Sequence, residues 1–427
     1  MNQPNTEFPE LSPQEWKLKV QAELGGLDYN EVLVWDSPEG IQVKPLYTRD
    51  DVEYTNSNII NTASDWKVIA DFSGHPDQDF SYLYGFNLND EQIENISRIP
   101  EYLDFFYHFK TPHETIQRTD FSKIPNLQYL GFDCLGNLAA TGNWYRSENE
   151  DFHLGREMLK EKHFAKSLLV NASLYQNAGA NHVQQIAIAL AHGNEYLQKF
   201  GGESAEKIFF KTAVGSNYFF EIAKLRALRK LWGIIASEYG TTSDTFIYAE
   251  TSLRNKSVLD IHNNLIRGGL EVSAAAQGKA DAVFVYPFDA IQNGSDFSEE
   301  LASKQQLLLQ RESHFDKFQD PVAGGYFIEN LTDLFCKNAL ELFKKIESDG
   351  GFLKGLFEGS IQKMIAKSAA KEQAAFDEGK LVLIGVNKFR NPAEKPLELP
   401  GAVPNKTKVL IEPIFPKRLA AKLEKSL

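Results

Sequence analysis

The sequence has only two cysteines and three methionines among its 427 residues. Cys134 and Cys336 lie too far apart in the chain to form a metal cluster by themselves. We expect two buried thiols in a cytosolic protein, with a single disulfide as the alternative. The amino terminus lacks the basic start and apolar core of a secretory signal, and no uncharged apolar run reaches the roughly 18 residues of a membrane span. A cytoplasmic location, away from the membrane, is therefore predicted.

Positive charge is also scarce, since 45 Lys and Arg face 58 Asp and Glu, for a net charge of −13. No Lys/Arg-rich block of about 5 to 8 residues occurs. This balance argues against nucleic acid or anionic lipid as the main partner.

Several motifs of common enzyme classes are missing. No GxGxxG follows an apolar run and no GxxxxGK[ST] occurs, which removes the main support for nucleotide binding. The histidines form no HxxxH or HExxH pair, and there is no GxSxG elbow for a nucleophilic serine. We predict that His75, His108, His182 and His262 are solvated or lie at the edge of the core, and that the chain binds no metal.

What the sequence does contain is a series of eight short apolar runs between Trp66 and Phe288, most of them followed by a helix-like stretch. Continuous runs rich in Val, Ile, Phe and Tyr are typical of buried parallel strands. Eight strands alternating with helices favour a (β/α)₈ barrel. Because some connections in the first half look short, a doubly wound sheet is the alternative. The runs are WKVIADF, SYLYGF, YLDFFYHF, LQYLGFD, SLLVNAS, KIFFKTAVG, TFIYAETS and DAVFVYPF.

Apolar periodicity predicts helices over 181–197 and 219–232. In the first, Val183, Ile186, Leu190 and Leu197 share one stripe. In the second, we expect an apolar stripe to face inward and three cations to face water. The inward residues are Ile222, Leu225 and Leu228, and the cations are Lys224, Arg226 and Arg229.

Outside the barrel, Ser12 and Pro13 predict a helix start, and Gly25-Gly26 its end. Further helices are expected over 298–315, 330–350 and 359–380, followed by a last strand at 381–389 and a short closing helix near Leu419. The predicted organisation is an amino-terminal helix and arm (1–60), a barrel (61–330), and carboxyl-terminal helices with an extended tail (331–427).

Two stretches imitate the DxHxxG pattern by which some enzymes ligate the cobalt of cobalamin. One places Asp151 and His153 before a glycine that comes one residue early, and the other has Asp260 and His262 but no glycine. A real site needs a loop after a strand with Gly-rich turns downstream, so neither is expected to bind metal.

Segments in consistent order from about residue 10 to the end resemble the methylmalonyl-CoA mutase family. The resemblance implies an acyl-CoA-binding barrel, and a radical rearrangement of methylmalonyl-CoA and succinyl-CoA that uses adenosylcobalamin. In some members a reacting large subunit pairs with a similar small subunit that does not react. The segments are SPEGIQVKPLYTRDD, GFDCLGNLAATGNWY, SLYQNAGANHVQQIAIALAHGNEYL, NYFFEIAKLRALRKLW, ETSLRNKSVLDIHNNLIRGGLEVSAAAQG, DPVAGGYFIENLT and LVLIGVNKFRNP.

Aligned with catalytic members, the segment that begins at Ala172 departs from the family pattern. The family's catalytic Tyr falls on Ser173 and its catalytic His on Leu174, while the acidic residue nearby becomes Asn177. We find no counterpart of the substrate-clamping Arg segment, and the chain stops at Leu427 without an expected cobalamin domain. The resemblance therefore implies a small, non-catalytic subunit that binds no cofactor alone, with adenosylcobalamin on the large partner.

If any ligand binds, we expect it near the carboxyl ends of the strands, where barrel sites assemble. The interior of the run at 167–173 is expected to hold Ser167, Leu169 and Asn171, with Leu169 filling the space that catalytic members leave for the pantetheine arm of CoA. The candidate residues are Asn171, Ser173, Gln176, Asn177, Glu250, Thr251 and Asp289.

Three hypotheses remain open from the sequence. The first is an architectural subunit whose arm wraps a large mutase chain through Trp16, Trp35 and Tyr47, although these rings could instead pack on their own barrel. The second is a catalytic mutase barrel that works with a separately encoded cobalamin-binding subunit. The third is an unrelated barrel hydrolase or aldolase.

Overall fold

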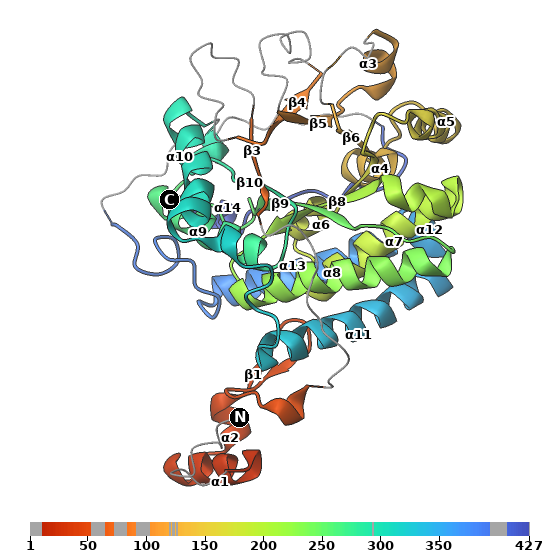
Figure 1. Cartoon of the computed structure of the whole chain (residues 1–427). Coiled ribbons are helices and arrows are strands. Elements are labelled where there is room, and N and C mark those ends of the chain that lie inside the picture. The colour runs from red at the N-terminus through yellow and green to blue at the C-terminus, as the bar shows by residue number, and fades with distance from the viewer. Residues whose placement is uncertain are drawn as a thin grey trace.

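In the computed structural model the chain forms a closed barrel of eight parallel strands (Figure 1). The structure describes residues 11–52, 65–71, 83–90, 103–118, 121, 124, 127–292, 294–392 and 408–426. The barrel strands are β3 (Lys67–Asp71), β4 (Gly85–Asn89), β5 (Asp104–His108), β6 (Tyr129–Phe132), β7 (Lys166–Asn171), β8 (Ile208–Val214), β9 (Phe246–Thr251) and β10 (Ala282–Phe284).

Pairing of the last strand with the first closes the barrel, and this decides between the two predicted architectures. Val283 of β10 is the register partner of Val68 in β3, while β10 also pairs with β9. The doubly wound alternative is therefore excluded. Each of the eight apolar runs contains all or part of a strand, although β4 begins only at Gly85, late in its run.

The interior of the barrel is packed with large side chains. Phe106 stacks on Tyr129 with ring centroids 4.2 Å apart, and Tyr248 lies 5.2 Å from Phe106. Leu169 belongs to this cluster, as predicted from its place in the run at 167–173. The barrel is thus solid at this level, which is the usual state of such folds. The cluster comprises Ile69, Phe106, Tyr129, Leu169, Phe209, Tyr248, Ala282 and Phe284, with Phe246 and Tyr286 partly buried against it.

Helices surround the barrel, and those of the second half are long. The helix α7 begins with a capping box in which Asn181 accepts from the Gln184 backbone and Gln184 from that of Asn181. No described helix is both long and apolar enough to cross a membrane. The helices are α3 (Pro112–Arg118), α4 (Cys134–Thr141), α5 (Glu148–Lys160), α6 (Ser173–Ala178), α7 (His182–Phe200), α8 (Tyr218–Glu238), α9 (His262–Gln277) and α10 (Asp296–Leu307), which continues into a π-turn (Leu308–Glu312).

The predicted inward stripes of α7 and α8 are buried, but the prediction for the charged face of α8 was wrong. Lys224 is 1% exposed and Arg226 2%, because α8 lies between α7, α9 and α11 (Tyr326–Ser348). Both charges are paired: Lys224 with Glu221, and Arg226 with Asp320 at 2.7 Å. Arg229 is largely covered too and pairs with Asp281 at 2.6 Å. Cations that are buried between helices are tolerated only when they are paired.

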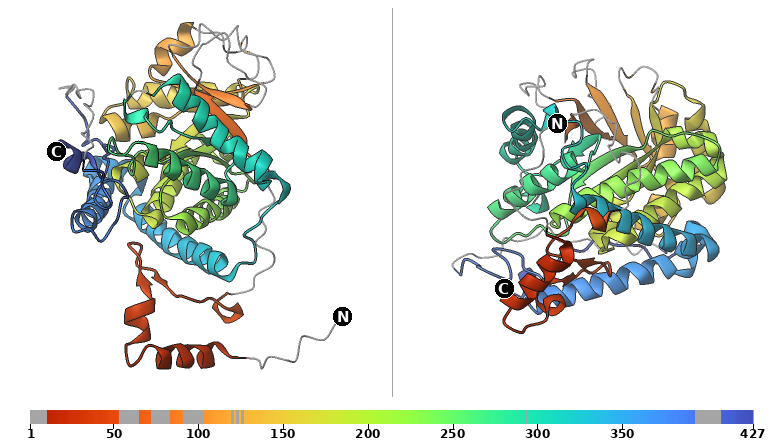
Figure 2. Two further views of the ribbon diagram at one scale, coloured as in Figure 1. Left: turned by 90° about the vertical axis from the view of Figure 1, so that its left-hand side faces the viewer. Right: turned by 60° about the horizontal axis from the view of Figure 1, so that its bottom comes forward.

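The amino-terminal part projects from the barrel as an arm, which we define as residues 11–52 (Figure 2). It begins with α1 (Pro13–Glu23), capped by Ser12 as predicted, and continues through α2 (Tyr29–Leu33). A two-stranded antiparallel hairpin, β1 (Trp35–Asp36) and β2 (Gln42–Val43), follows. No residue of α1 is buried, and the helix packs against α2 of the same arm.

The carboxyl-terminal part contains α11, α12 (Gly351–Glu358), α13 (Ser360–Asp377) and α14 (Ala421–Lys425). α11 packs along α7 and α8 (Figure 1). The strand predicted at 381–389 does not form. Gly385 takes a φ of 76°, and the Asn387 side chain bonds the backbone of Leu383 at 2.7 Å, so the segment folds into a tight turn. Most of the predicted extended tail lies outside the described residues.

Both cysteines carry free thiols, so the disulfide alternative is excluded. Cys134 is buried as predicted, whereas Cys336 is only partly covered. Burial raises the pKa of Cys336 to about 12, which leaves it a weak nucleophile.

Candidate functional site

The candidate site is a ring of polar side chains at the carboxyl ends of the barrel strands, above the packed interior. Each of six strands contributes one residue, which lies between the middle of the strand and its carboxyl end. Because side chains alternate along a strand, each of these residues points to the same side as the residue two positions before it. Lys211, for example, lies above Phe209 of the interior cluster. The polar ring is Asp71, Asn87, His108, Asn171, Lys211 and Glu250.

Within the polar ring, Lys211 and Glu250 form an ion pair at 2.8 Å. The hydroxyl of Tyr286 donates to the same carboxylate at 3.1 Å. Burial, and then the negative charge of Glu250, raises the pKa of Tyr286 well above 10, so the phenol stays protonated. The ion pair engages the Lys211 amine and the Glu250 carboxylate, which are the two groups of the polar ring best suited to proton transfer.

Across the barrel, Asn87 is the acceptor for two groups. Tyr248 donates to its amide oxygen at 2.7 Å, and His108 Nε2 lies 3.2 Å from the same atom. Burial, together with the positive charge of Lys211, lowers the pKa of His108 well below 6.5, which leaves the imidazole neutral. The Asn87 amide in turn donates to Asp71 at 3.0 Å.

Next to the ring, the short helix α6 carries Ser173 and Leu174, and every residue of α6 is buried. Leu174 is 6% exposed and lies in the main hydrophobic core. The Ser173 hydroxyl is buried with no hydrogen-bond partner among the described residues, as is the amide oxygen of Asn171. At the end of α6, Gly179 has a φ of 102°, and a Cβ there would lie 2.5 Å from the Ala369 side chain. The helix is therefore pressed against α13.

A buried polar chain fixes where this segment lies. Asp133 accepts from the Asn171 backbone at 3.0 Å and from His192 at 3.0 Å. His192 in turn lies 2.8 Å from the Tyr175 hydroxyl on α6. Because Asp133 also caps α4, one carboxylate ties together α4, α7 and the end of β7. The side chain of Tyr175 thus serves structure.

Two predicted site residues of α6 hold the loop after β9. Gln176 accepts from the Ser252 hydroxyl at 3.0 Å. Asn177 accepts from the backbone N–H groups of Leu253 and Arg254 at 3.0 and 3.1 Å. Their polar atoms are therefore engaged within the protein.

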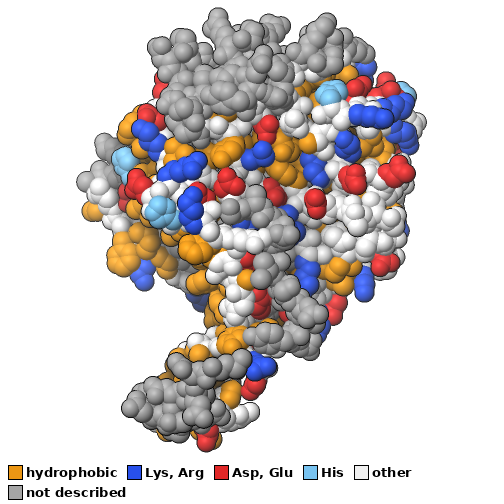
Figure 3. Space-filling view, in the orientation of Figure 1, with side chains coloured by type: hydrophobic (Ala, Val, Ile, Leu, Met, Phe, Trp, Pro, Cys, Tyr) orange, Lys and Arg blue, Asp and Glu red, His pale blue; other side chains and the backbone are white. Residues whose placement is uncertain are grey.

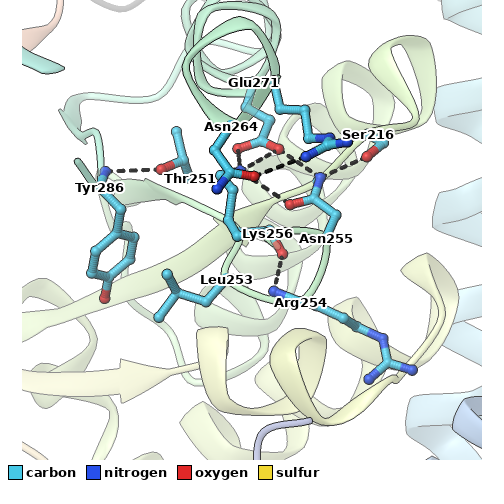
Figure 4. Close-up of polar contacts among 12 residues, drawn as sticks. Ser216, Thr251, Leu253, Arg254, Asn255, Lys256, Asn264, Glu271 and Tyr286 are labelled. Atoms are coloured by element: carbon cyan, nitrogen blue, oxygen red, sulfur yellow. Dashed lines mark hydrogen bonds and ion pairs between the residues drawn. The ribbon is translucent and has the colours of Figure 1, made fainter. Parts of the chain in front are cut away.

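The loop after β9 is itself built on a buried charge pair (Figure 4). Lys256 donates to both oxygens of Glu271 at 2.8 and 2.7 Å. Asn255 donates to Glu271 at 2.7 Å and to Ser216 at 2.6 Å. The loop is thereby attached to α9 and to the segment before α8.

The remaining predicted residues fall into two places. The Thr251 hydroxyl accepts from the Tyr286 backbone at 2.9 Å, next to the polar ring. Asp289 accepts from Ser295 at 2.9 Å, near the start of α10. Of the seven candidates, Asn171 and Glu250 belong to the polar ring, and Asp289 belongs to the loop before α10.

Sequence reasoning missed Lys211, His108, Asn87 and Asp71. The signal was present, since each is a polar residue within an apolar run or directly after one. These residues are found only when the alternation of inward and outward side chains is traced along every run. The prediction traced it only along the run at 167–173.

The described residues do not fit a cobalt-ligating loop. Asp151 lies inside α5, fully buried, and His113 lies 2.6 Å from its carboxylate, while His153 faces solvent on the same helix. Asp260 accepts from Asn263 at 2.6 Å, and the His262 ring packs 5.4 Å from that of Phe288. Among the described residues no group of three or more His, Cys, Asp or Glu side chains could hold a metal ion.

Comparison with known proteins gives a consistent result. The family model described as methylmalonyl-CoA mutase matches residues 128–411. The methylmalonyl-CoA mutase small subunit of Porphyromonas gingivalis is 31% identical over 453 aligned positions, which cover 91% of this chain and 71% of the relative. The methylmalonyl-CoA mutase of Cereibacter sphaeroides is 35% identical and the large subunit of P. gingivalis 33%, over 56% and 55% of this chain. The alignments with these two cover about a third of their length.

Proposed function

Since the chain belongs to the methylmalonyl-CoA mutase family, we propose that it is the small, non-catalytic subunit of a heterodimeric mutase. In this proposal the large subunit binds adenosylcobalamin and carries out the isomerisation of methylmalonyl-CoA and succinyl-CoA. This chain contributes an assembly surface and a stable barrel, and binds no cofactor alone.

Leu174 is the observation that carries the proposal. At this place catalytic members have a histidine that donates to the thioester carbonyl, and a leucine has no donor. Loss of such a donor typically costs about 2.7 to 4 kcal/mol of transition-state stabilisation, roughly a hundred- to thousand-fold in rate. The side chain is also buried as part of the hydrophobic core.

The packed interior supports the same conclusion. Phe106, Tyr129 and Phe209 occupy the space through which an extended pantetheine arm would have to pass. We therefore expect acyl-CoA binding to be weak or absent in this subunit.

The arm is the proposed contact with the large subunit. Apolar side chains of the arm remain exposed in the isolated chain: Trp35 is 47% exposed, and Leu18 and Leu27 more so. Figure 3 shows hydrophobic side chains at the surface where the arm leaves the barrel. A pocket of about 190 Å³ lies between α1 and the hairpin and is lined by Trp16, Tyr29 and Leu46 among others. Exposed apolar surface next to such a pocket is typical of protein interfaces.

The structure alters the set of aromatic anchors proposed from the sequence. Trp16 packs edge-to-face against Tyr29 at 6.3 Å, and Tyr47 lies 5.0 Å from Phe327 of α11. These two rings therefore help to build the arm and attach it to the barrel. Trp35 lies 5.4 Å from Phe220 but keeps about half its surface free for a partner.

The proposal is tested by producing the full chain with and without the large subunit of the same organism. We expect a one-to-one complex in size-exclusion chromatography, and isomerase activity only when the large subunit is present. A chain that stays alone in the presence of the large subunit would contradict the proposal. Turnover by the isolated chain supplied with adenosylcobalamin would also contradict it, and turnover only with a separately encoded cobalamin-binding subunit would favour the second hypothesis.

A further inference from the structure

The turn of the arm's hairpin inserts one carboxylate into the barrel's helical layer. Glu39 lies between β1 and β2, and its side chain is 2% exposed. Its Oε1 lies 2.7 Å from His182 Nδ1 and accepts from the His182 backbone at 3.3 Å. Beside it, the Asn181 amide donates to the backbone oxygen of Pro38 at 3.2 Å. The turn is thus bonded to the start of α7.

His182 connects the arm's carboxylate to a second one on α8. Its Nε2 lies 3.3 Å from Glu221 Oε1, and Glu221 is also paired with Lys224. The Glu221 carboxylate accepts from the Gly215 backbone at 2.8 Å, immediately after β8. A buried cluster with balanced charge therefore spans the arm, α7 and α8. It consists of the carboxylates of Glu39 and Glu221, the imidazolium of His182 and the ammonium of Lys224.

Other contacts also join the arm to the barrel. They include the ring contacts of Trp35 and Tyr47, a bond from the Asn330 amide to the Asp51 backbone oxygen at 2.6 Å, and the burial of Ile41 in the main hydrophobic core. A two-stranded hairpin is at best marginally stable alone, so its position depends on what it is attached to. In some proteins a buried ionic group sets the register of the elements that it joins.

We propose that Glu39, His182, Glu221 and Lys224 form a latch that sets the arm in the position in which it binds the large subunit. This inference rests on the proposed function, since it names the residues that position the assembly surface. Trp35 lies four residues before Glu39, so a shift of the hairpin would move this exposed ring directly. Glu39 acts as a positioning residue and need not touch the partner.

The latch is tested with Glu39→Gln in the full chain, which keeps the shape of the side chain and removes its charge. Glu238→Gln is the matched control, because Glu238 is an exposed carboxylate at the end of α8, outside the arm. Hydrogen exchange of residues 35–43 in the isolated chain reports whether the arm is docked. Affinity for the large subunit of the same organism reports whether docking matters for assembly. A buried pair that loses one charge is strongly weakened, so we expect faster exchange and at least a tenfold lower affinity for Glu39→Gln alone.

The two readouts separate the latch from the proposed function. If the unaltered chain does not bind the large subunit, the proposed function fails, while the exchange measurement still shows whether Glu39 holds the arm. Unchanged exchange in Glu39→Gln would overturn the latch. Faster exchange with unchanged affinity would overturn its role in assembly.

Discussion

At the scale of single residues, Leu174 is a buried member of the main hydrophobic core. It lies next to Tyr175, whose hydroxyl is 2.8 Å from His192 Nδ1. A histidine at position 174 would place an imidazole where the surroundings are apolar.

We expect Leu174→His to lower the free energy of unfolding by about 2 to 3 kcal/mol, because an apolar side chain is lost and a polar one is buried. We expect no isomerase activity from the isolated variant, since one donor does not empty the packed interior. Denaturant unfolding and an isomerase assay with adenosylcobalamin check both expectations. Leu174→Met is the matched control and should stay near the unaltered stability, whereas activity in Leu174→His alone would contradict the account.

His182 gives a prediction for pH dependence. Burial by itself would lower the pKa of His182, but Glu39 and Glu221 raise it to about 9. Burial would likewise raise the pKa of Glu221, but Lys224 and His182 lower it to about 2. The rings of Phe220 and Phe335 complete the surroundings of the imidazole.

Because the folded pKa of His182 lies above its unfolded value of 6.5, its stabilisation is complete below pH 6.5 and is lost as the pH rises toward 9. We expect the free energy of unfolding to fall by about 1 to 3 kcal/mol over this window. The Glu221 contribution is constant there, since it is lost only in acid. Unfolding curves between pH 6 and 9.5 test this, and Glu39→Gln should flatten the slope. An equal slope in the variant would contradict the assignment.

At the scale of elements, the loop after β9 depends on one buried ion pair. Lys256 and Glu271 have side chains only 3% and 1% exposed, and Asn255 shares the same carboxylate. Removing one member leaves an uncompensated charge in the interior.

We expect Lys256→Met to cost about 3 to 5 kcal/mol of stability. The double variant Lys256→Met with Glu271→Leu should recover much of this loss, because an apolar pair of similar volume carries no desolvation penalty. Denaturant unfolding of the two single variants and the double variant measures the coupling. Purely additive losses would show that the pair contributes little.

The packed barrel interior is the second element-scale feature with a measurable consequence. Phe106, Tyr129 and Leu169 occupy the interior cluster, and the strand ends above them form an engaged polar ring. We expect calorimetry of methylmalonyl-CoA with the isolated chain to show no binding in the micromolar range, while the large subunit, as the control, binds it. Micromolar binding to the isolated chain would count against the non-catalytic assignment.

At the scale of the whole molecule, the carboxyl-terminal segment joins parts that are distant in sequence. The backbone of Ile414 donates to Ala139 of α4 at 2.7 Å, and Lys417 donates to Asn177 of α6 at 2.9 Å. Leu419 then donates to Arg254 in the loop after β9 at 2.9 Å. This segment therefore ties α4, α6 and the β9 loop together.

Two adjacent residues of this segment form a matched pair for a test. Ile414 is 4% exposed, whereas Phe415 is 60% exposed. We expect Ile414→Ala to cost about 2 to 5 kcal/mol and Phe415→Ala to stay within about 0.5 kcal/mol. Thermal and denaturant unfolding compare the two. Equal effects would show that the segment is not part of the cooperative unit.

The amino-acid sequence by itself determined the number and order of the barrel strands and the start of α1. Buried parallel strands are continuous apolar runs, and a helix cap is a local arrangement, so both are recorded in neighbouring residues. The sequence also determined that Leu174 cannot donate a hydrogen bond, because this follows from the side chain alone.

Only the tertiary structure decided which charges are buried, and where the polar groups of the site meet. Lys224 and Arg226 look exposed on an amphipathic helix until α7 and α11 pack against α8. Residues 381–389 look like a strand until the Asn387 side chain bonds the Leu383 backbone and closes a turn. Glu39 and His182 are separated by 143 positions yet lie 2.7 Å apart. Such contacts depend on elements distant in the sequence, and no local pattern of residue types records which surfaces will be brought together.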